Sequence, residues 1–240
     1  IYQINLALAG IAVGTVSLPV LSAAFKQKNI LKISNIQNRS IELCLLLSIP
    51  ASLGLILASD QIVSALFGYG SFTEENVLMT GLALKYFGYG VPAFALIKIL
   101  SNFFFARNNT KTPFYISTAV VLFNIFLSIT FFSRIGFIII PIATSFSTWI
   151  GVLLYFYFLN DRKILLLKDY LLKNIIKIIS CTIIMSLLLI FSIEQYSDYL
   201  KYSYKFKSIY LMLIVGFVAT IYLILYIFLR VLKKKNFITQ

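Results

Sequence analysis

The sequence predicts an all-α membrane protein, a polytopic bundle of seven transmembrane helices. Hydrophobic residues make up 60% of the 240-residue chain, and charged residues make up only 12%, about half the share that is usual in a soluble domain. The apolar residues also gather in seven runs, each long enough to cross the roughly 30 Å hydrocarbon core of a bilayer as a helix. We place these spans at residues 3–24, 41–67, 80–105, 114–133, 137–159, 175–193 and 208–230.

The first run carries small residues at helical spacing. Gly10, Gly14 and Ser17 fall on one face of a helix, where they let a neighbouring helix approach closely. Gln3 and Asn5 lie near the outer end of the same run, and we include them among the candidates for lining a substrate cavity. In the linker that follows, isoleucines alternate with lysines, which predicts a short helix on the membrane surface.

The third run contains a lysine far from either end. Lys98 lies nine residues before Arg107, or about 13 Å along a helix axis, which is further than a lysine side chain comfortably reaches toward the interface. A charge at this depth usually faces a cavity or a partner, and Ser101 and Asn102 extend a polar stripe on the same face. We therefore take Lys98, Ser101 and Asn102 as cavity candidates. The alternatives for Lys98 are a structural bond to helix carbonyls and snorkelling.

A basic turn follows the third run. Arg107, Asn109 and Lys111 form this turn, which we expect on the cytoplasmic side. Thr112 is the predicted N-cap of the next helix, and Pro113 suits its first position, because the missing N–H of proline has no partner there in any case. One helix is thus predicted to end at this turn and another to begin.

Lysines and arginines also set the orientation of the bundle, because cytoplasmic loops carry the positive excess. Fifteen of the 21 basic residues fall in connections on one side of the seven runs and four on the other, while Lys85 and Lys98 lie inside a run. We therefore predict that the loops 25–40, 106–113 and 160–174 are cytoplasmic. The C-terminus is predicted to be cytoplasmic as well.

Four stretches in the first half of the chain stand in a distinctive order, at residues 10–22, 49–55, 66–73 and 98–113. Together they resemble the C-terminal half of the MurJ (MviN) lipid II flippases, a family of the multidrug/oligosaccharidyl-lipid/polysaccharide exporter superfamily. That family has fourteen transmembrane helices, so the seven spans here would correspond to its helices 8–14, and residues 1–240 to a C-terminal transmembrane bundle without its N-terminal half. Asn109 stands where the family has an aspartate, so a capping side chain is kept and a charge is lost.

The resemblance implies a transporter that flips lipid II, the lipid-linked peptidoglycan precursor, from the cytoplasmic to the periplasmic leaflet of a bacterial inner membrane by alternating access. Its partners would be the undecaprenyl-linked substrate, membrane lipids and the missing N-terminal half of the same protein. The last two spans would form a groove for the lipid tail. Two alternatives are a flippase for another polyprenyl-linked oligosaccharide, of O-antigen or teichuronic type, and a membrane scaffold of a cell-wall assembly complex.

The composition disfavours an enzyme. The chain has no histidine and no glycine-rich phosphate loop, and its carboxylates are single and dispersed apart from the adjacent Glu74 and Glu75. Acid–base catalysis by histidine, histidine-containing metal sites and nucleotide hydrolysis therefore lack their usual residues. We expect no catalytic residue, metal or cofactor. The net charge of +13 is spread over short connections between apolar runs, which topology explains better than nucleic-acid binding. Cys44 and Cys181 lie within apolar runs and are predicted to be buried free thiols.

Overall fold

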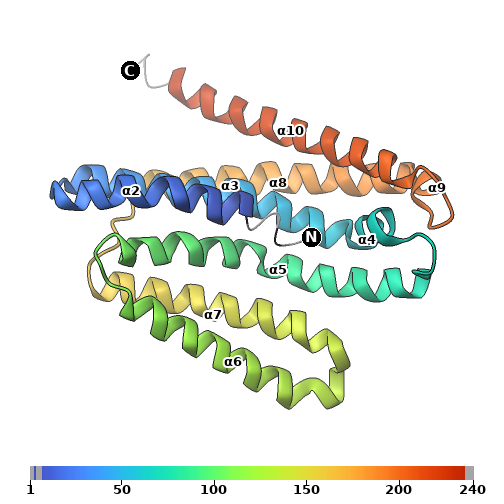
Figure 1. Ribbon diagram of the computed structural model, residues 1–240. Helices are drawn as coiled ribbons and strands as arrows, with labels where there is room; N and C mark the ends of the chain where they lie inside the picture. The colour runs from blue at the N-terminus through green and yellow to red at the C-terminus, as the bar shows by residue number, and fades with distance from the viewer. Residues whose placement is uncertain (1–2, 4–6, 236–240) are drawn as a thin grey trace. The chain divides into compact units, whose positions relative to one another are not determined.

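The computed structural model of the protein describes residue 3 and residues 7–235, and every regular element among them is a helix (Figure 1). This confirms the predicted all-α class. Six helical stretches are long and apolar enough to cross a membrane, and the fourth of them is 51 residues long. That stretch contains two helices, which accounts for the difference from the seven expected spans. The six stretches are Ala9–Lys26, Ile30–Leu57, Glu74–Phe105, Lys111–Asp161, Asp169–Gln195 and Lys207–Arg230.

The chain forms two compact units. Unit 1 comprises Ile1–Ser52 and Tyr86–Ile175, and unit 2 comprises Leu53–Lys85 and Ile176–Gln240. Three helices contribute residues to both units: α3 (Ile30–Leu57), α5 (Glu74–Phe105) and α8 (Asp169–Gln195).

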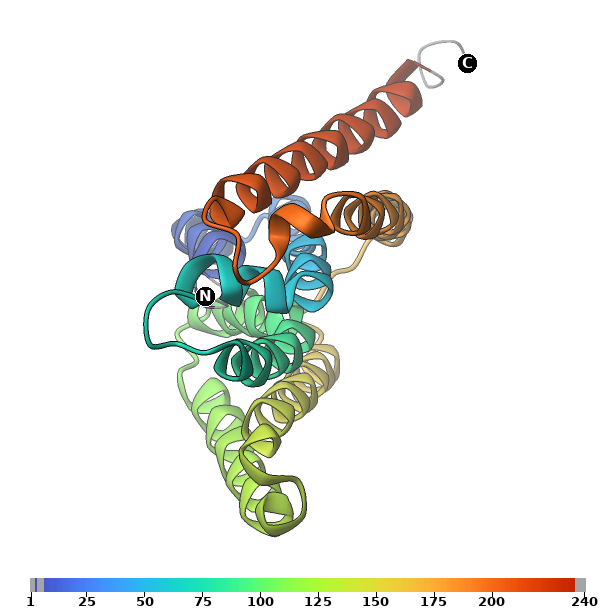
Figure 2. The same ribbon diagram turned by 90° about the vertical axis from the view of Figure 1, so that its right-hand side faces the viewer.

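Unit 1 holds the N-terminal elements and a helical hairpin. It begins with the π-helix η1 (Ala7–Ala12) and continues directly into α2 (Val13–Lys26). Helices α6 (Lys111–Ile135) and α7 (Ile139–Asp161) lie side by side and antiparallel (Figures 1 and 2). They are joined by the short 3₁₀ turn η2 (Gly136–Ile138), where the φ of 72° at Gly136 is a conformation that glycine adopts without strain.

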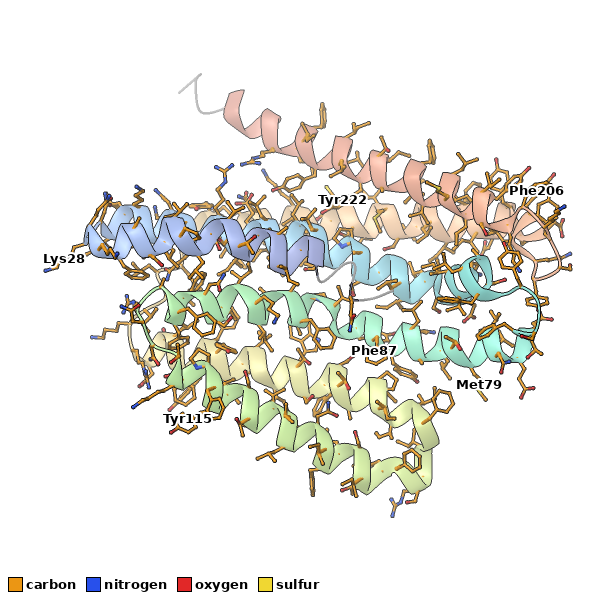
Figure 3. All side chains as sticks on the ribbon, in the orientation of Figure 1. Lys28, Met79, Phe87, Tyr115, Phe206 and Tyr222 are labelled. Carbon is orange, nitrogen blue, oxygen red and sulfur yellow. The ribbon has the colours of Figure 1, made fainter. Side chains whose placement is uncertain are left out.

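Three connections of unit 1 lie at the same end of that unit, between α2 and α3, between α5 and α6, and between α7 and α8 (Figure 1). Lys28 projects from the tip of the first of them, and Tyr115 lies near the start of α6 at the same end (Figure 3). The exposed cations there include Lys26, Lys28, Arg107, Lys111 and Lys163. Basic residues from these three connections, which the sequence assigns to one side of the membrane, are therefore gathered at one end of unit 1. The side of the membrane stays a prediction.

Helix α3 differs from what the sequence predicts at both ends. It begins at Ile30 and runs unbroken to Leu57, so the predicted surface helix in the linker is instead the first part of this long helix. At Ala58 the backbone leaves the helical region, with φ −113° and ψ 22°, and a separate helix α4 (Ser59–Phe67) follows. The single span expected at 41–67 is thus divided between α3 and α4.

One face of the first turns of α3 is buried, and two side-chain amides on that face bind a distant loop. Gln37 donates to the carbonyl of Ile164 (3.0 Å) and accepts from the N–H of Leu166 (3.2 Å). Asn38 donates to the carbonyl of Leu166 (2.7 Å) and accepts from the N–H of Lys168 (2.9 Å). The two amides, which we call the carboxamide clamp, therefore pair with alternate residues of the loop, as a neighbouring strand would.

Unit 2 contains α4, α9 (Ser197–Leu200), α10 (Lys207–Lys235) and parts of α3, α5 and α8. Tyr222, on the side of α10 that faces α8 in Figure 3, is only 3% exposed. Lys207 is buried at the start of α10 and donates to the carbonyls of Gly68 (2.7 Å) and Tyr202 (2.6 Å). Its ammonium also lies 4.5 Å from the ring centroids of Tyr69 and Tyr202. A side chain that the sequence counts as a loop cation thus ties α10 to the end of α4.

Candidate functional site

Two cavities of unit 1 meet around Lys98. The first has a volume of about 600 Å³ and lies among α2, α5, α6 and α7. The second has a volume of about 590 Å³. Both volumes fall within the range of about 300 to 1,000 Å³ that is typical of ligand sites. Five residues line both cavities and so form the boundary between them: Ile11, Ile97, Lys98, Ser117 and Tyr155.

Lys98 gives these cavities their charge. Its side chain is exposed, and it is the only charged residue among the described residues that line either cavity. Within the described part of the chain, no hydrogen bond or ion pair holds its ammonium group. Three N–H donors on a cation are therefore available to a ligand that carries negative charge.

Ser101 and Asn102 lie where the sequence places them, beside Lys98 in the wall of the first cavity. The hydroxyl of Ser101 donates to the carbonyl of Lys98 (3.0 Å). The side-chain amide of Asn102 donates to the carbonyl of Gly14 in α2 (2.9 Å), and a Cβ atom added to Gly14 would lie only 3.1 Å from that nitrogen. Asn102 therefore joins α5 to α2 at a close helix contact, and its amide nitrogen is already engaged.

Gln3 lines the second cavity and is exposed. Asn5, the other candidate in the first run, lies outside the described residues. The candidates from the first and third runs are thus brought to one region of unit 1 wherever the structure describes them.

The basic turn adjoins the first cavity through Thr110 and Pro113, which belong to its lining. The Arg107 guanidinium lies 4.5 Å from the centre of the Phe25 ring, and its partial burial lowers its pKa, although an arginine keeps its charge in proteins. Lys111 is the first residue of α6.

The side chain of Asn109 caps the N-terminus of α6, as its place in the family's motif implies, and Thr112 does not. Asn109 accepts a hydrogen bond from the N–H of Thr112 (3.1 Å) and donates to the hydroxyl of Thr112 (3.0 Å). The prediction that Thr112 is the N-cap is therefore wrong, because the helix begins at Lys111 and Thr112 already lies inside it. The amide of Asn109 takes this role because a side-chain oxygen three residues earlier reaches the free N–H.

Sequence reasoning missed Ser117 and Tyr155. Tyr155 is 1% exposed on α7 and packs against Phe104, with 6.1 Å between the ring centroids, and Ser117 on α6 lines the same two cavities. Tyr155 belongs to a run of four aromatic residues, and Ser117 to a helix of ordinary apolar composition. No signal in the sequence distinguishes them from lipid-facing or packing residues.

In the described part of the chain, no three histidine, cysteine, aspartate or glutamate residues are grouped to hold a metal ion. The site consists instead of one free cation and several hydroxyls inside a bundle of membrane-spanning helices. Together with the six long apolar stretches, this architecture is that of a polytopic membrane protein.

The comparisons with known proteins define the family. The sequence profile of the family described as lipid II flippase MurJ matches residues 1–211, and the chain therefore belongs to the MurJ lipid II flippase family. The probable lipid II flippase MurJ of Rickettsia prowazekii is 33% identical over 205 residues, which are 85% of this chain and 40% of that protein. The protein of the same name from Rhizobium meliloti is 40% identical over 156 residues, 65% of this chain and 29% of that one.

A solved structure supports the same assignment. The structure of lipid II flippase MurJ in an inward closed conformation superposes with a TM-score of 0.78 at 28% sequence identity, covering 96% of this chain and 45% of that chain. The chain thus spans less than half the length of these relatives.

Proposed function

We propose that this chain is the C-terminal half of a flippase that carries lipid II from the cytoplasmic to the periplasmic leaflet of a bacterial inner membrane. The observation that carries the proposal is the cationic cavity around Lys98 in a chain of the MurJ family. The lipid II head group contains a pyrophosphate, and a lysine ammonium without a protein partner suits such an acceptor-rich anion. Ser101, Gln3 and Asn5 would complete this half of the polar lining, with Asn102 holding the wall.

The N-terminal half is the partner that the proposal requires. Alternating access in transporters built from repeats proceeds by rocking one bundle against the other around a binding site. The proposed mechanism involves no catalytic residue, cofactor or nucleic acid. The undecaprenyl tail would stay in lipid along α8 and α10, which expose large apolar side chains such as Phe191 and Met212.

Depletion of the full-length protein tests the substrate. Lipid II should accumulate in the inner leaflet, and cells should lose their shape or lyse. Normal growth with loss of only a surface polysaccharide would instead indicate a flippase for another polyprenyl-linked glycan. A scaffold function would be indicated if a variant that binds no lipid II still supported normal growth.

The orientation is tested by thiol labelling of a version without native cysteines. Because the basic turn is predicted to be cytoplasmic, a cysteine at Asn109 should resist a membrane-impermeant reagent added to intact spheroplasts. A cysteine at Thr73, which is exposed in the loop before α5, should react. The reverse pattern would invert the predicted topology and place the C-terminus outside.

A further inference from the structure

The boundary between the two cavities carries three polar groups. The proposed function assigns a role to Lys98 and none to the other two. Lys98 comes from α5, Ser117 from α6 and Tyr155 from α7. Each of these residues lines both cavities, whereas Ser101 and Asn102 line only the first and Gln3 only the second. A ligand that extends through both cavities must therefore pass these three side chains.

Counting protons shows what Ser117 and Tyr155 can offer. Each hydroxyl has one O–H, and both side chains line both cavities. Both protons can be donated to a ligand, because no described hydrogen bond uses either hydroxyl. Together with the three N–H donors of Lys98, the boundary is rich in donors, and no described residue that lines either cavity carries a carboxylate.

The fold holds Tyr155 firmly at this place. Its ring packs against Phe104, so the hydroxyl is presented by a side chain that has little freedom to move. Gly151, one helical turn earlier, allows α5 and α6 to approach α7 closely, because an added Cβ atom would lie 2.8 Å from a methyl group of Val120 and 3.0 Å from one of Ile97. The distance between the three helices, and with it the separation of the three polar groups, is set by this packing.

We propose that the Ser117–Tyr155 hydroxyl pair is a second head-group contact of the flippase, which donates a hydrogen bond to a phosphate oxygen of the lipid-linked substrate while Lys98 neutralises its charge. The inference rests on the proposed function and assigns residues to it. A phosphate oxygen is the expected acceptor because it is the anionic part of the substrate and so the part that Lys98 attracts. The neutral hydroxyl pair would orient the phosphate, because the strength of a hydrogen bond depends on its angle. The charge of Lys98 attracts the phosphate without fixing its orientation.

The test uses the full-length protein in detergent, with lipid II and undecaprenyl pyrophosphate as probes. Tyr155→Phe keeps the ring against Phe104 and removes only the hydroxyl, so its melting temperature should equal that of the unchanged protein. Loss of one hydrogen bond to a charged acceptor should weaken the binding of both probes by about tenfold. Tyr157→Phe is the matched control, because Tyr157 is 66% exposed on the same helix and lines neither cavity.

A double-mutant cycle separates a ligand contact from a packing effect. If Lys98 and Tyr155 hold the same phosphate, the losses in Lys98→Ala and Tyr155→Phe should not add in the double variant. Ser117→Ala should weaken binding less than Tyr155→Phe, because the phenol keeps its own proton.

Three outcomes decide between the proposals. Weakened binding in Tyr155→Phe, with unchanged binding in Tyr157→Phe, supports the inference. Unchanged binding of both probes by Tyr155→Phe overturns the inference and leaves the flippase proposal in place. A protein with neither substitution that fails to bind lipid II overturns the proposed function itself, and with it the inference.

Discussion

Lys98 lies inside an apolar run of the sequence and Lys207 in a polar connection, and their surroundings in the structure are opposite. Lys207, in unit 2, is 1% exposed, donates to two backbone carbonyls and lies between two tyrosine rings. Lys98, in unit 1, is exposed in a cavity, and no described group bonds to its ammonium. The same side chain thus ties helices together in one unit and leaves its donors free in the other.

The difference teaches how to separate a structural polar group from a functional one in a membrane protein. A buried donor whose hydrogen bonds are satisfied stabilises the fold, and removing it leaves its acceptors without partners. A charge without a protein partner costs free energy at its depth in the membrane and is expected to serve a function. The position of a lysine in the sequence does not tell whether it is structural or functional. The hydrogen-bond partners that other segments supply in the folded protein do tell.

The largest change in stability is expected at Lys207. Lys207→Ala leaves the carbonyls of Gly68 and Tyr202 without their charged donor, so the free energy of unfolding should fall by about 3 kcal/mol. Thermal unfolding in detergent measures this change. Lys205→Ala, an exposed lysine two residues earlier, is the control and should melt like the unchanged protein. Equal melting of both variants would show that Lys207 is not a structural residue and would break the comparison.

A smaller loss of stability is expected at the carboxamide clamp. Its side chains are uncharged, and like Lys207 they are hydrogen-bonded to protein groups. Gln37→Ala removes two hydrogen bonds to the loop and should cost about 2 kcal/mol. Hydrogen exchange of the Leu166 N–H should accelerate as well. Asn35→Ala is the control, because Asn35 is exposed and accepts only from the Lys168 ammonium. If the Leu166 N–H exchanges equally slowly in both variants, the clamp does not hold the loop.

The smallest change in stability is expected at Lys98, where the effect should fall on transport. Lys98→Ala should melt like the unchanged protein and export lipid II at least tenfold more slowly, a loss of about 1.4 kcal/mol in substrate interaction. Lys98→Arg should retain more export than Lys98→Gln, because positive charge is the common requirement. Undiminished export by the Ala variant, at a normal protein level, would remove Lys98 from the mechanism.

Much of the fold could be predicted because the length and hydropathy of a span are local properties. The apolar runs around residues 80–105 and 137–159 became α5 and α7 with modest changes at their ends. The start of α3 could not be predicted, since Gln37 and Asn38 read as surface residues until a loop more than 120 residues away satisfies them. The break at Ala58 lacks a proline or glycine that would indicate it.

The candidate site could be predicted only where a residue conflicts with its sequence environment. Lys98 stands out because a charge within an apolar run is costly, and Ser101 and Asn102 follow from helical spacing. Tyr155 and Ser117 do not conflict with their surroundings, and only the packing of α5, α6 and α7 brings them to Lys98. Lys207 shows the converse, because a cation in a loop-like stretch gives no hint that it is buried.

The carboxamide clamp determines which substitutions the linker before α8 can tolerate during evolution. Gln37 and Asn38 recognise the backbone of Leu166 and Lys168, not their side chains. Substitutions at positions 166 and 168 can therefore accumulate without loosening the loop, provided that each new residue has a backbone N–H group. Proline is the residue excluded there, because it has no N–H to donate. A stretch free to drift in sequence can in this way keep a single conformation.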